Sequence, residues 1–589
     1  MPRALPPEIF AELDRHFAAL LERLAGGSRP TLALAAALVS RQRRAGHLCL
    51  HLPSVAGQRL TEKEVAVTCP PLDAWLADLG AATPVVGSPG AFAPLILDPA
   101  GRLYLQRYWA YEDRLARDLL ARAAITEPVD ETRLAAVLDR LFPPTDSEPD
   151  WQRLAAETAV RRRLCVITGG PGTGKTRTLV RILALLQELH GNAPTPLRFA
   201  LAAPTGKAAA RIQEEVRRAA QTLSPGSVAD ALLATEATTL HRLLGARPDY
   251  ATFRRNAENP IPAEVVVVDE ASMVDLALMA KLLAAVPPTA RLVLLGDKDQ
   301  LASVEAGAVL GDICTPPSST LHLPSSPLRS SLIELRRNYR FPAHSAIHRL
   351  STAINHGDAE SALTALAEAG EVTAHRLPTP NELPAALRPL LLAAWPEQLL
   401  PDPAEMLVRL ARFRVLCAVR EGPYGVHHFN ELAERILAEA GRIERGGSHY
   451  AGRPILITRN DHALRLFNGD IGILLPGPEG GLRAFFPAPE GGVRSFLPAR
   501  LPAHETVFAM TVHKSQGSEF ASILLVLPER DSPVLTRELL YTGLTRAREH
   551  AELWFNESIF RPAVARRVER HSGLGHALWP NGTGSLPLG

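Results

Sequence analysis

The sequence predicts an α/β protein built on two parallel sheets. From Trp151 onward, short apolar runs alternate with helical patterns, which is the order of elements in a parallel sheet covered by helices. The run 265–268 is four consecutive valines, so its strand should be buried on both faces. A second set of apolar runs begins at Arg414 and predicts a second sheet, with a cleft between the two. The predicted strands are 164–168, 199–203, 265–268 and 291–295 in the first sheet, and 414–419, 522–527 and 551–555 in the second.

Length and composition indicate several globular domains. A chain of 589 residues exceeds one core, so three or four domains are expected. With 46% hydrophobic residues, 21% charged residues and a net charge of +2, it has no broadly cationic face, and any nucleic acid should bind in a local groove. The apolar run 31–39 is too short for a membrane span and no signal peptide is visible, so a cytoplasmic protein is expected. The cysteines contain no C-x-x-C pair, which argues against disulfides and zinc: Cys49, Cys69, Cys165, Cys314 and Cys417.

The amino-terminal region, 1–118, is predicted to be a mainly helical domain that docks a partner. Phe10, Leu13, Phe17 and Leu20 fall on one helical face. Aromatic residues gather at 103–111; they are interpreted as core, with a partner-docking surface as the alternative. The remaining boundaries are a linker at 119–150, where prolines accumulate, and a Gly/Pro-rich tail at 576–589.

A phosphate-binding loop is predicted at 169–176, where Gly-Gly-Pro-Gly-Thr-Gly-Lys-Thr lies between a predicted strand and a predicted helix. In this setting the glycines turn backbone N–H groups inward and the helix N-terminus adds its positive dipole end. Lys175 should reach the β- and γ-phosphates, and the Thr176 hydroxyl should bind Mg²⁺. The nucleotide-binding residues predicted here are Gly169, Gly170, Pro171, Gly172, Thr173, Gly174, Lys175, Thr176 and Arg177.

Further catalytic candidates follow the next predicted strands. Asp269 and Glu270 end the four-valine strand, and ligands of parallel sheets lie outside the carboxyl ends of the strands. Asp269 is therefore predicted to hold Mg²⁺ together with the Thr176 hydroxyl, and Glu270 to polarise the attacking water. Gln300 lies after the next strand and can contact the γ-phosphate. Arg340 and Arg546 are candidate arginine fingers, which supply positive charge to the γ-phosphate in the transition state.

Two pairs of histidines could be interpreted as a metal site, but a surface helix is the stronger interpretation. His344 and His348 have the i, i+4 spacing of a helical metal pair, and His427 and His428 are adjacent. No acidic or cysteine ligand stands near them in the sequence, so a surface helix is favoured.

The order of these motifs resembles that of superfamily-1 helicases. The phosphate loop is followed by Asp-Glu-Ala-Ser at 269–272, Gly-Asp-x-x-Gln-Leu at 296–301 and Asn-Tyr-Arg at 338–340. Further along stand Thr-Val-His-Lys-Ser-Gln-Gly-Ser-Glu-Phe at 511–520 and Tyr-Thr-x-Leu-Thr-Arg-Ala at 541–547. Within that superfamily the chain is most similar to the RecD-like helicases. Four further segments carry this closer resemblance: Leu-Ala-Ala-Pro-Thr-Gly-Lys at 201–207, Thr-Leu-His-Arg-Leu-Leu-Gly at 239–245, Arg-Glu-Gly-Pro-Tyr-Gly at 420–425 and Asn-Gly-Asp-Ile-Gly at 468–472. The resemblance covers about 151–560.

The resemblance implies a domain plan. It consists of two RecA-like domains, at 151–345 and at 346–450 with 506–575, an SH3-like insert at 451–505, and a hairpin at about 246–262. It also implies that Gln152 reads the adenine edge, that Tyr339 stacks on the base, and that Gly517 and Glu519 contact the nucleotide, Glu519 at the ribose. The residues that the resemblance implies in single-stranded DNA binding are Thr205, His241, Asn460, Asn468, His513, Lys514 and Ser515.

The resemblance further implies an ATP-dependent DNA helicase with ATP and Mg²⁺ as cofactors and 5′-to-3′ movement on single-stranded DNA. It implies a heterotrimer with RecB and RecC, the exodeoxyribonuclease V complex, acting at double-strand ends in recombinational repair. No clustered-carboxylate nuclease motif is visible, so nuclease activity is expected only in a partner. Two alternatives are a stand-alone RecD-like or RNA-directed helicase, and an assembly subunit that binds ATP without turnover. Six intact motor residues argue against the second: Lys175, Asp269, Glu270, Gln300, Arg340 and Arg546.

Overall fold

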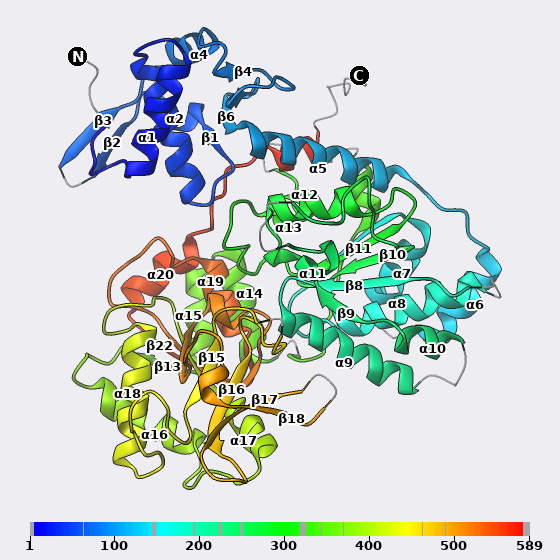
Figure 1. The fold of residues 1–589 in the computed structure, drawn as a ribbon, viewed down its shortest axis with the longest axis vertical. Coiled ribbons are helices and arrows are strands. Elements are labelled where there is room, and N and C mark those ends of the chain that lie inside the picture. The colour runs from blue at the N-terminus through cyan, green and yellow to red at the C-terminus, as the bar shows by residue number, and fades with distance from the viewer. Residues whose placement is uncertain are drawn as a thin grey trace.

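The computed structural model describes residues 5–580 apart from 63, 144–148, 192–194, 223–226, 248–249, 251, 318–325, 343, 369, 462 and 489–490. The predicted fold class is confirmed: two parallel sheets, each covered by helices, form two α/β domains, with an antiparallel insert and an amino-terminal domain beside them (Figure 1). Among the described residues, no helix combines the length and the apolar character needed to cross a membrane. All five cysteines are buried and free.

Domain 1 contains a six-stranded parallel sheet with the strand order β12-β7-β11-β10-β8-β9. Its strands are β7 (Leu164–Thr168), β8 (Phe199–Ala203), β9 (Ala237–Thr239), β10 (Val265–Val268), β11 (Arg291–Gly296) and β12 (Leu332–Glu334). Its helices are α6 (Glu131–Leu141), α7 (Trp151–Arg161), α8 (Lys175–His190), α9 (Gly206–Thr222), α10 (Ser227–Leu233), α11 (Leu240–Leu244), α12 (Leu276–Ala285) and α13 (Val309–Cys314).

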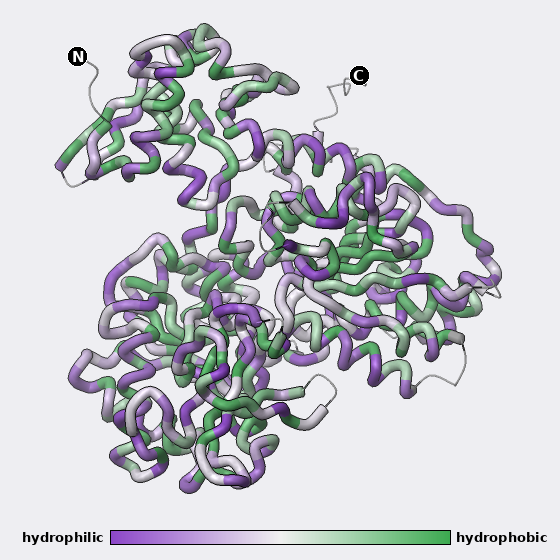
Figure 2. Tube along the Cα trace, in the orientation of Figure 1, coloured by the Kyte–Doolittle hydropathy of each residue, from purple (hydrophilic) through white to green (hydrophobic). Residues whose placement is uncertain are grey.

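The four valines of β10 show why this sheet is buried on both faces. Val266 and Val268 pack into one hydrophobic cluster, and Val265 and Val267 pack into another on the opposite face. All four side chains are fully buried, as the sequence predicts. Figure 2 shows the same arrangement as hydrophobic strands inside a more polar shell of helices. The sheet is thereby rigid enough to hold the polar residues that follow each strand in fixed positions.

Domain 2 contains a five-stranded parallel sheet with the order β13-β22-β21-β14-β20. Its strands are β13 (Val372–Arg376), β14 (Phe413–Cys417), β20 (Ala509–Thr511), β21 (Phe520–Val526) and β22 (Ala547–Phe555). Its helices are α14 (Ala346–His356), α15 (Ala359–Ala367), α16 (Leu383–Ala394), α17 (Pro403–Leu410), α18 (Val426–Glu439), α19 (Arg537–Leu544) and α20 (Glu557–Ala565).

A five-stranded antiparallel sheet interrupts domain 2 between α18 and β20, in the segment where an inserted β domain is expected. Its strands are β15 (Pro454–Ile457), β16 (Ile471–Pro476), β17 (Leu482–Pro487), β18 (Val493–Phe496) and β19 (His504–Thr506), in the order β18-β17-β16-β15-β19. Ile455, Leu474 and Phe486 form a small core of its own. The insert therefore folds as a unit attached to domain 2.

The amino-terminal region joins helices to two small sheets. The helices are α1 (Glu12–Leu24), α2 (Pro30–Arg44), α3 (Leu52–Val55), α4 (Leu72–Gly80) and the long α5 (Gln106–Ala124). The strands are β1 (Cys49–His51), β2 (Arg59–Glu62), β3 (Val65–Thr68), β4 (Val86–Gly87), β5 (Leu95–Leu97) and β6 (Arg102–Leu105). Tyr104 is fully buried, which agrees with the interpretation of the aromatic cluster as core.

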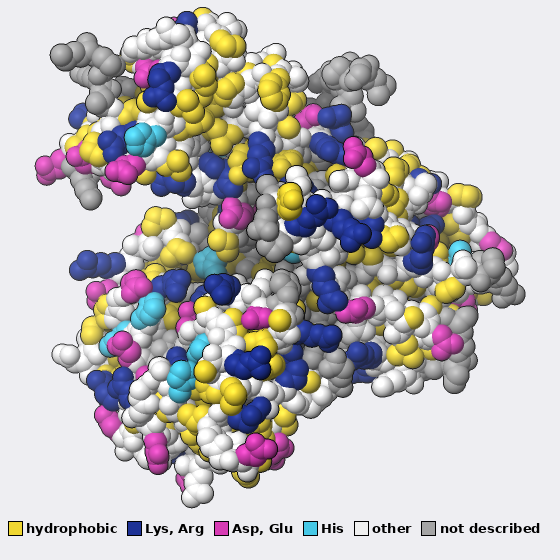
Figure 3. All heavy atoms as spheres, in the orientation of Figure 1, with side chains coloured by type: hydrophobic (Ala, Val, Ile, Leu, Met, Phe, Trp, Pro, Cys, Tyr) yellow, Lys and Arg dark blue, Asp and Glu magenta, His cyan; other side chains and the backbone are white. Residues whose placement is uncertain are grey.

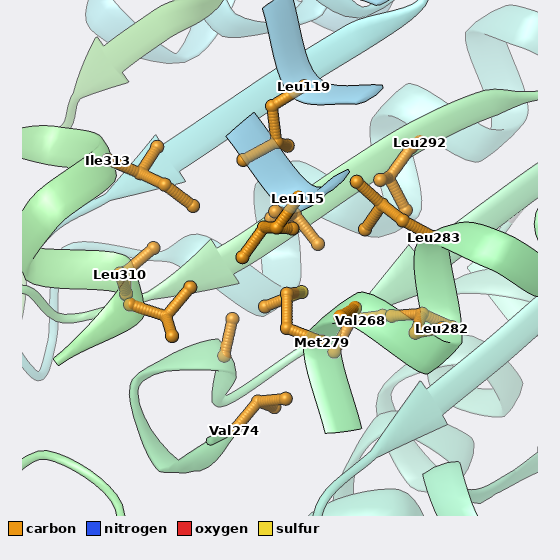
Figure 4. Close-up of a cluster of buried hydrophobic side chains, with 14 of the residues drawn as sticks. Leu115, Leu119, Val268, Val274, Met279, Leu282, Leu283, Leu292, Leu310 and Ile313 are labelled. Carbon is orange, nitrogen blue, oxygen red and sulfur yellow. The ribbon is translucent and has the colours of Figure 1, made fainter. Parts of the chain in front are cut away.

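Three predicted boundaries are wrong, because apolar side chains near them are buried in domain 1. The boundary at residue 118 falls inside α5, whose Leu115 and Leu119 pack against Met279 and Leu292 (Figure 4). The predicted linker contains α6, which packs on α8 through its buried face. The predicted tail begins inside α21 (Leu574–Leu578), which joins the same cluster as α5.

The predicted hairpin at about 246–262 lies partly outside the described residues, which leave out 248, 249 and 251. Among the described residues of this segment, none belongs to a strand. Its base is closed by two backbone bonds, from Arg254 N–H to the Gly245 carbonyl at 3.1 Å and from Arg255 N–H to the Leu244 carbonyl at 2.9 Å.

Candidate active site and nucleic-acid interface

The phosphate-binding loop runs from the end of β7 to the start of α8. Gly172 and Gly174 have φ values of +84° and +82°, a conformation that side chains disfavour. A Cβ at Gly172 would lie 2.5 Å from both the Arg340 Cβ and the Asn338 Oδ1, so only glycine fits. The Lys175 ammonium donates to the carbonyls of Gly169 (2.6 Å) and Gly170 (3.1 Å), which holds it folded over the loop.

The two predicted acidic residues lie at the end of β10, opposite this loop. Thr176 Oγ1 is 3.5 Å from Asp269 Oδ2, so a hydroxyl and a carboxylate face one another. Burial, together with the neighbouring Glu270, raises the pKa of Asp269 to about 6. Glu270 has a φ of +52°, which is costly for a non-glycine residue and re-aims its side chain into the cavity. The Thr176 hydroxyl and the Asp269 carboxylate are hard oxygen donors and fit Mg²⁺, which binds through few protein ligands and keeps most of its waters.

A cavity of about 320 Å³ collects the predicted catalytic residues from both domains. Lys175, Asp269 and Glu270 come from domain 1, whereas Glu519 and Arg546 come from domain 2 and lie hundreds of residues away in the sequence. The cavity is lined by Pro171, Gly172, Gly174, Lys175, Thr176, Arg177, Ala208, Arg211, Glu215, Asp269, Glu270, Gln300, Tyr339, Arg340, Gly517, Glu519 and Arg546.

Gln300 is connected to domain 2 through a buried hydrogen-bond network. Its side-chain amide donates to Asp297 Oδ2 at 3.0 Å, and the Tyr541 hydroxyl donates to the same oxygen at 2.9 Å. The next residue, Leu301, donates its backbone N–H to Thr542 Oγ1 at 2.9 Å. The loop that carries Gln300 is therefore fixed to α19. Sequence reasoning missed Asp297 and Tyr541, although both stand inside the motifs that contain Gln300 and Arg546.

Arg546 reaches the cavity from the end of α19. Its side chain is 3% exposed, and burial lowers its pKa. Its guanidinium donates to the carbonyls of Thr542 (3.0 Å) and Ser518 (3.2 Å). Among the described residues Arg546 forms no ion pair, and the carboxylates of Glu270 and Glu519 act on its charge without pairing with it.

Glu519 forms ion pairs with three arginines from different parts of the chain. Arg340 and Arg211 each lie 2.8 Å from its Oε1, and Arg548 lies 2.9 Å from its Oε2. Burial alone would raise the pKa of Glu519, but the three guanidinium groups outweigh it and hold this pKa well below its usual range. Arg211 was not predicted from the sequence. The signal that could have found it is its position on α9, about one turn after the Thr205-Gly-Lys motif at the start of that helix.

A second, smaller pocket lies beside the phosphate loop and contains both residues predicted to bind the base. It is lined by Gln152, Trp151 and Tyr339, among others. Gln152 donates to the Thr173 carbonyl at 3.3 Å, and the Tyr339 N–H donates to the Gly172 carbonyl at 2.8 Å. Tyr339 is 54% exposed, and the Arg337 guanidinium lies over its ring at 5.1 Å from the centroid, so this ring already takes part in one stacking contact.

The residues predicted to bind DNA are distributed over three parts of the fold. Thr205 caps α9 by accepting from the Ala208 N–H at 3.2 Å, and His241 stands edge-on to Phe253 at 5.8 Å. Asn460 accepts from the Asn468 N–H at 2.8 Å in the insert. Figure 3 shows Lys and Arg side chains along the boundary between the two domains on the face that it draws.

The predicted DNA contacts of domain 2 are partly engaged within the protein. Lys514 pairs with Glu505 at 2.6 Å. Ser515 is fully buried, and its hydroxyl donates to the Val512 carbonyl at 2.7 Å, so this hydroxyl does not reach the surface. His513 is half-buried, and burial lowers its pKa.

Comparisons with known proteins match three parts of the chain. Residues 7–104 match the family model "RecBCD enzyme subunit RecD, N-terminal domain", 152–306 match an AAA domain, and 506–553 match a UvrD-like helicase C-terminal domain. The chain is 43% identical to the RecBCD enzyme subunit RecD of Mycolicibacterium smegmatis, covering 98% of this chain and 99% of that protein. It is 36% identical to the protein of the same name from Haemophilus influenzae, covering 81% and 80%. It is 32% identical to the ATP-dependent RecD2 DNA helicase of Deinococcus radiodurans, covering 80% of this chain but 57% of that protein.

Proposed function

The chain belongs to the RecD family of RecBCD enzyme subunits, and we propose that it is the motor that uses ATP to move along single-stranded DNA and unwind it. The observation that carries this proposal is the cavity between the domains. It combines a phosphate loop and a carboxylate pair from domain 1 with Glu519 and Arg546 from domain 2. Such a site is complete only when both domains face the nucleotide, so nucleotide binding and domain position are linked.

ATP binding is assigned to the two adjoining pockets. Tyr339 stacks on the adenine and Gln152 hydrogen-bonds its edge in the smaller pocket. The phosphates extend along the loop toward Lys175, where backbone N–H groups and the α8 N-terminus favour negative charge. Thr176 and Asp269 would hold Mg²⁺, which supplies charge neutralisation at the β- and γ-phosphates when it is bound.

Hydrolysis is assigned to residues that face the γ-phosphate end of the cavity. Glu270 orients the attacking water and accepts its proton, and Gln300 contacts both the water and the γ-phosphate. Arg340 and Arg546 stabilise the charge that develops on the transferred phosphoryl group. Because Gln300 is fixed to α19 through Asp297 and Leu301, loss of the γ-phosphate changes the packing of domain 2 on domain 1.

Single-stranded DNA is proposed to lie across both domains, along Thr205 and His241 on domain 1 and His513 and Lys514 on domain 2. Hydroxyl, imidazole and ammonium groups contact a phosphate backbone without reading its bases, which suits a motor that must accept any sequence. Asn460 and Asn468 of the insert border this path. Opening and closing of the domains then moves the strand, with 5′-to-3′ polarity by similarity to the family.

The proposed partners are RecB and RecC, with the amino-terminal domain as the docking module. Leu13, Leu20 and Leu24 lie at i, i+7 and i+11 on α1 and are 64%, 42% and 52% exposed. Such an apolar stripe on an otherwise packed domain is a typical protein-binding surface. Because its substrate is chromosomal DNA in a bacterial family, the protein works in the cytoplasm, and nuclease activity belongs to a partner subunit.

A stand-alone helicase is the second candidate, because the RecD2 helicase of Deinococcus radiodurans is also similar. Similarity favours the subunit: the chain is 43% identical to a RecD protein over 98% of its residues but 32% identical to that RecD2 protein over 80%, and residues 7–104 match the RecD N-terminal model. An assembly subunit that binds ATP without turnover is disfavoured, because the six motor residues are intact and all six line one cavity.

Strand separation tests the proposed function. Duplexes with a 5′ or a 3′ single-stranded overhang are incubated with the chain and ATP, alone and with RecB and RecC. The proposal expects ATP-dependent unwinding of the 5′-overhang duplex and little of the other. Equal unwinding of both duplexes would contradict the polarity, and unwinding of neither, with or without partners, would contradict the motor.

A further inference from the structure

The carboxylate of Glu519 is shared by three arginines, and two of them compete for one oxygen. Its side chain is 8% exposed and lies in the cavity wall. Arg340 Nη2 and Arg211 Nη1 both lie 2.8 Å from Oε1, whereas Arg548 Nε lies 2.9 Å from Oε2. Arg340 comes from the segment after β12, Arg211 from α9 of domain 1, and Glu519 from domain 2. The cluster therefore connects both domains at the γ-phosphate end of the cavity.

Sharing one oxygen weakens each of the two contacts at Oε1. A carboxylate oxygen that accepts from two guanidinium groups divides its charge between them, and the two cations repel one another. Arg340 also has an unused donor: its Nη1 is buried and has no hydrogen-bond partner among the described residues. Arg340 is thus held by a single shared contact on one side and has spare donor capacity on the other.

We propose that Arg211 is a positioning residue for ATP hydrolysis: by sharing Oε1 of Glu519, it weakens the hold of that carboxylate on Arg340 and leaves Arg340 available to the γ-phosphate. Without Arg211, Oε1 binds Arg340 alone, and the carboxylate competes more strongly with the γ-phosphate. This inference rests on the proposed function, because it assumes that Arg340 acts on ATP.

The position of Arg211 also connects this competition to DNA. Helix α9 begins directly after Thr205, and Lys207 in its first turn donates to Ser518 Oγ at 2.7 Å. Ser518 precedes Glu519 in the chain, so one short stretch carries both contacts between α9 and domain 2. A strand bound at Thr205 and at His513 would therefore shift Arg211 relative to Glu519, and the effect of Arg211 should concentrate in the DNA-stimulated rate.

A double-mutant experiment on the full chain tests this role. Steady-state ATP hydrolysis is measured with a thymidine oligonucleotide for the wild type, Arg211→Ala, Arg211→Lys, Glu519→Gln and the Arg211→Ala/Glu519→Gln double variant. Arg548→Ala is the matched control, because it also removes an arginine from Glu519 but at the other oxygen, Oε2, and the Arg548 side chain is 58% exposed. Its kcat should stay within about twofold of the wild type, since this variant leaves the contacts of Arg340 and Arg211 with Oε1 in place.

The inference expects Arg211→Ala to lower kcat by roughly tenfold while KM for ATP changes by less than about threefold, as loss of a transition-state contribution requires. Arg211→Lys should lose less, because an ammonium still supplies charge to Oε1. Glu519→Gln should restore kcat of the Arg211→Ala chain at least about threefold, since it removes the competing charge. A merely structural Arg211 gives no such rescue.

Two results would overturn the inference. One is a double variant no faster than Arg211→Ala; if Glu519 only contacts the ribose, Glu519→Gln raises KM in both backgrounds and rescues nothing. The other is an equal loss of kcat in Arg548→Ala. Failure of the proposed function is distinguishable, because the wild-type chain itself would then show no ATP hydrolysis stimulated by the oligonucleotide.

Discussion

Replacing Arg546 by alanine should separate nucleotide binding from turnover. In the proposed mechanism the Lys175 ammonium and the phosphate loop bind the nucleotide within domain 1, whereas Arg546 reaches the same cavity from domain 2. The Arg546 side chain should therefore contribute chiefly when the domains close on the transition state. Turnover is expected to fall by about 10³, the scale of an arginine finger, while ATP affinity stays within a few-fold.

The structure separates this effect from a loss of stability. Arg546 is 3% exposed and donates to the carbonyls of Thr542 and Ser518, so its removal leaves both without that donor. That loss should lower the free energy of unfolding by about 1–3 kcal/mol. The 10³ loss of rate corresponds to about 4 kcal/mol in the activation free energy, and it is measured on chains that remain folded.

The assay combines single-turnover hydrolysis with binding of a fluorescent ATP analogue and thermal unfolding. Arg530→Ala is the surface control, because the Arg530 side chain is 90% exposed. An Arg546→Ala chain that loses binding and turnover by the same factor would refute the reasoning, since Arg546 would then be a ground-state contact. Near-normal turnover would remove Arg546 from the mechanism altogether.

Three further predictions follow from the pockets and the packing. Tyr339→Ala should raise KM for ATP about tenfold with kcat nearly unchanged, because stacking of Tyr339 on the adenine stabilises the bound substrate and the transition state equally. A fall in kcat with unchanged KM would contradict this stacking. Glu112 is a buried residue of α5, and burial raises its pKa to about 7. At pH 8 the folded chain must therefore hold a buried charged carboxylate, so Glu112→Gln should stabilise the fold by up to about 3 kcal/mol at pH 8 and little at pH 5, where Glu112 is neutral in the folded chain. A difference in denaturant midpoint that does not change with pH would contradict this prediction. Replacing Leu13, Leu20 and Leu24 together by glutamate should abolish co-purification with RecC, while ATP hydrolysis stimulated by single-stranded DNA remains. Retention of RecC by this variant would exclude the apolar stripe on α1 as the docking surface.

The sheets and the clustering of the candidate site residues at one cavity were predictable from the sequence because local patterns determine them. The valine run of β10 is a buried strand whatever surrounds it, and the phosphate loop needs glycine wherever φ is positive. Residues inside such motifs meet at one cavity because the carboxyl ends of neighbouring parallel strands share one edge of the sheet. For this reason Lys175, Asp269 and Gln300 could be assigned together without any knowledge of their distances.

The domain boundaries were not predictable because they depend on contacts between distant segments. Helix α5 has the composition of a surface helix, and only the partner faces of α12 and α21 show that Leu115 and Leu119 are core. The segment after residue 565 returns to domain 1 and to the amino-terminal domain, as in the bond from Leu48 N–H to the His571 carbonyl at 2.9 Å. Arg211 was missed for the same reason, since its importance comes from Glu519 in the other domain.

The measurement that tests the motor account most directly is ATP hydrolysis by the full chain with and without single-stranded DNA, for the wild type and Lys175→Gln. The account predicts that DNA stimulates the wild type strongly and that Lys175→Gln abolishes hydrolysis at an unchanged melting temperature. Lys175 supplies charge to the phosphates and packs into no core, so its loss should not affect folding. A Lys175→Gln chain with a near-normal DNA-stimulated rate would contradict the account.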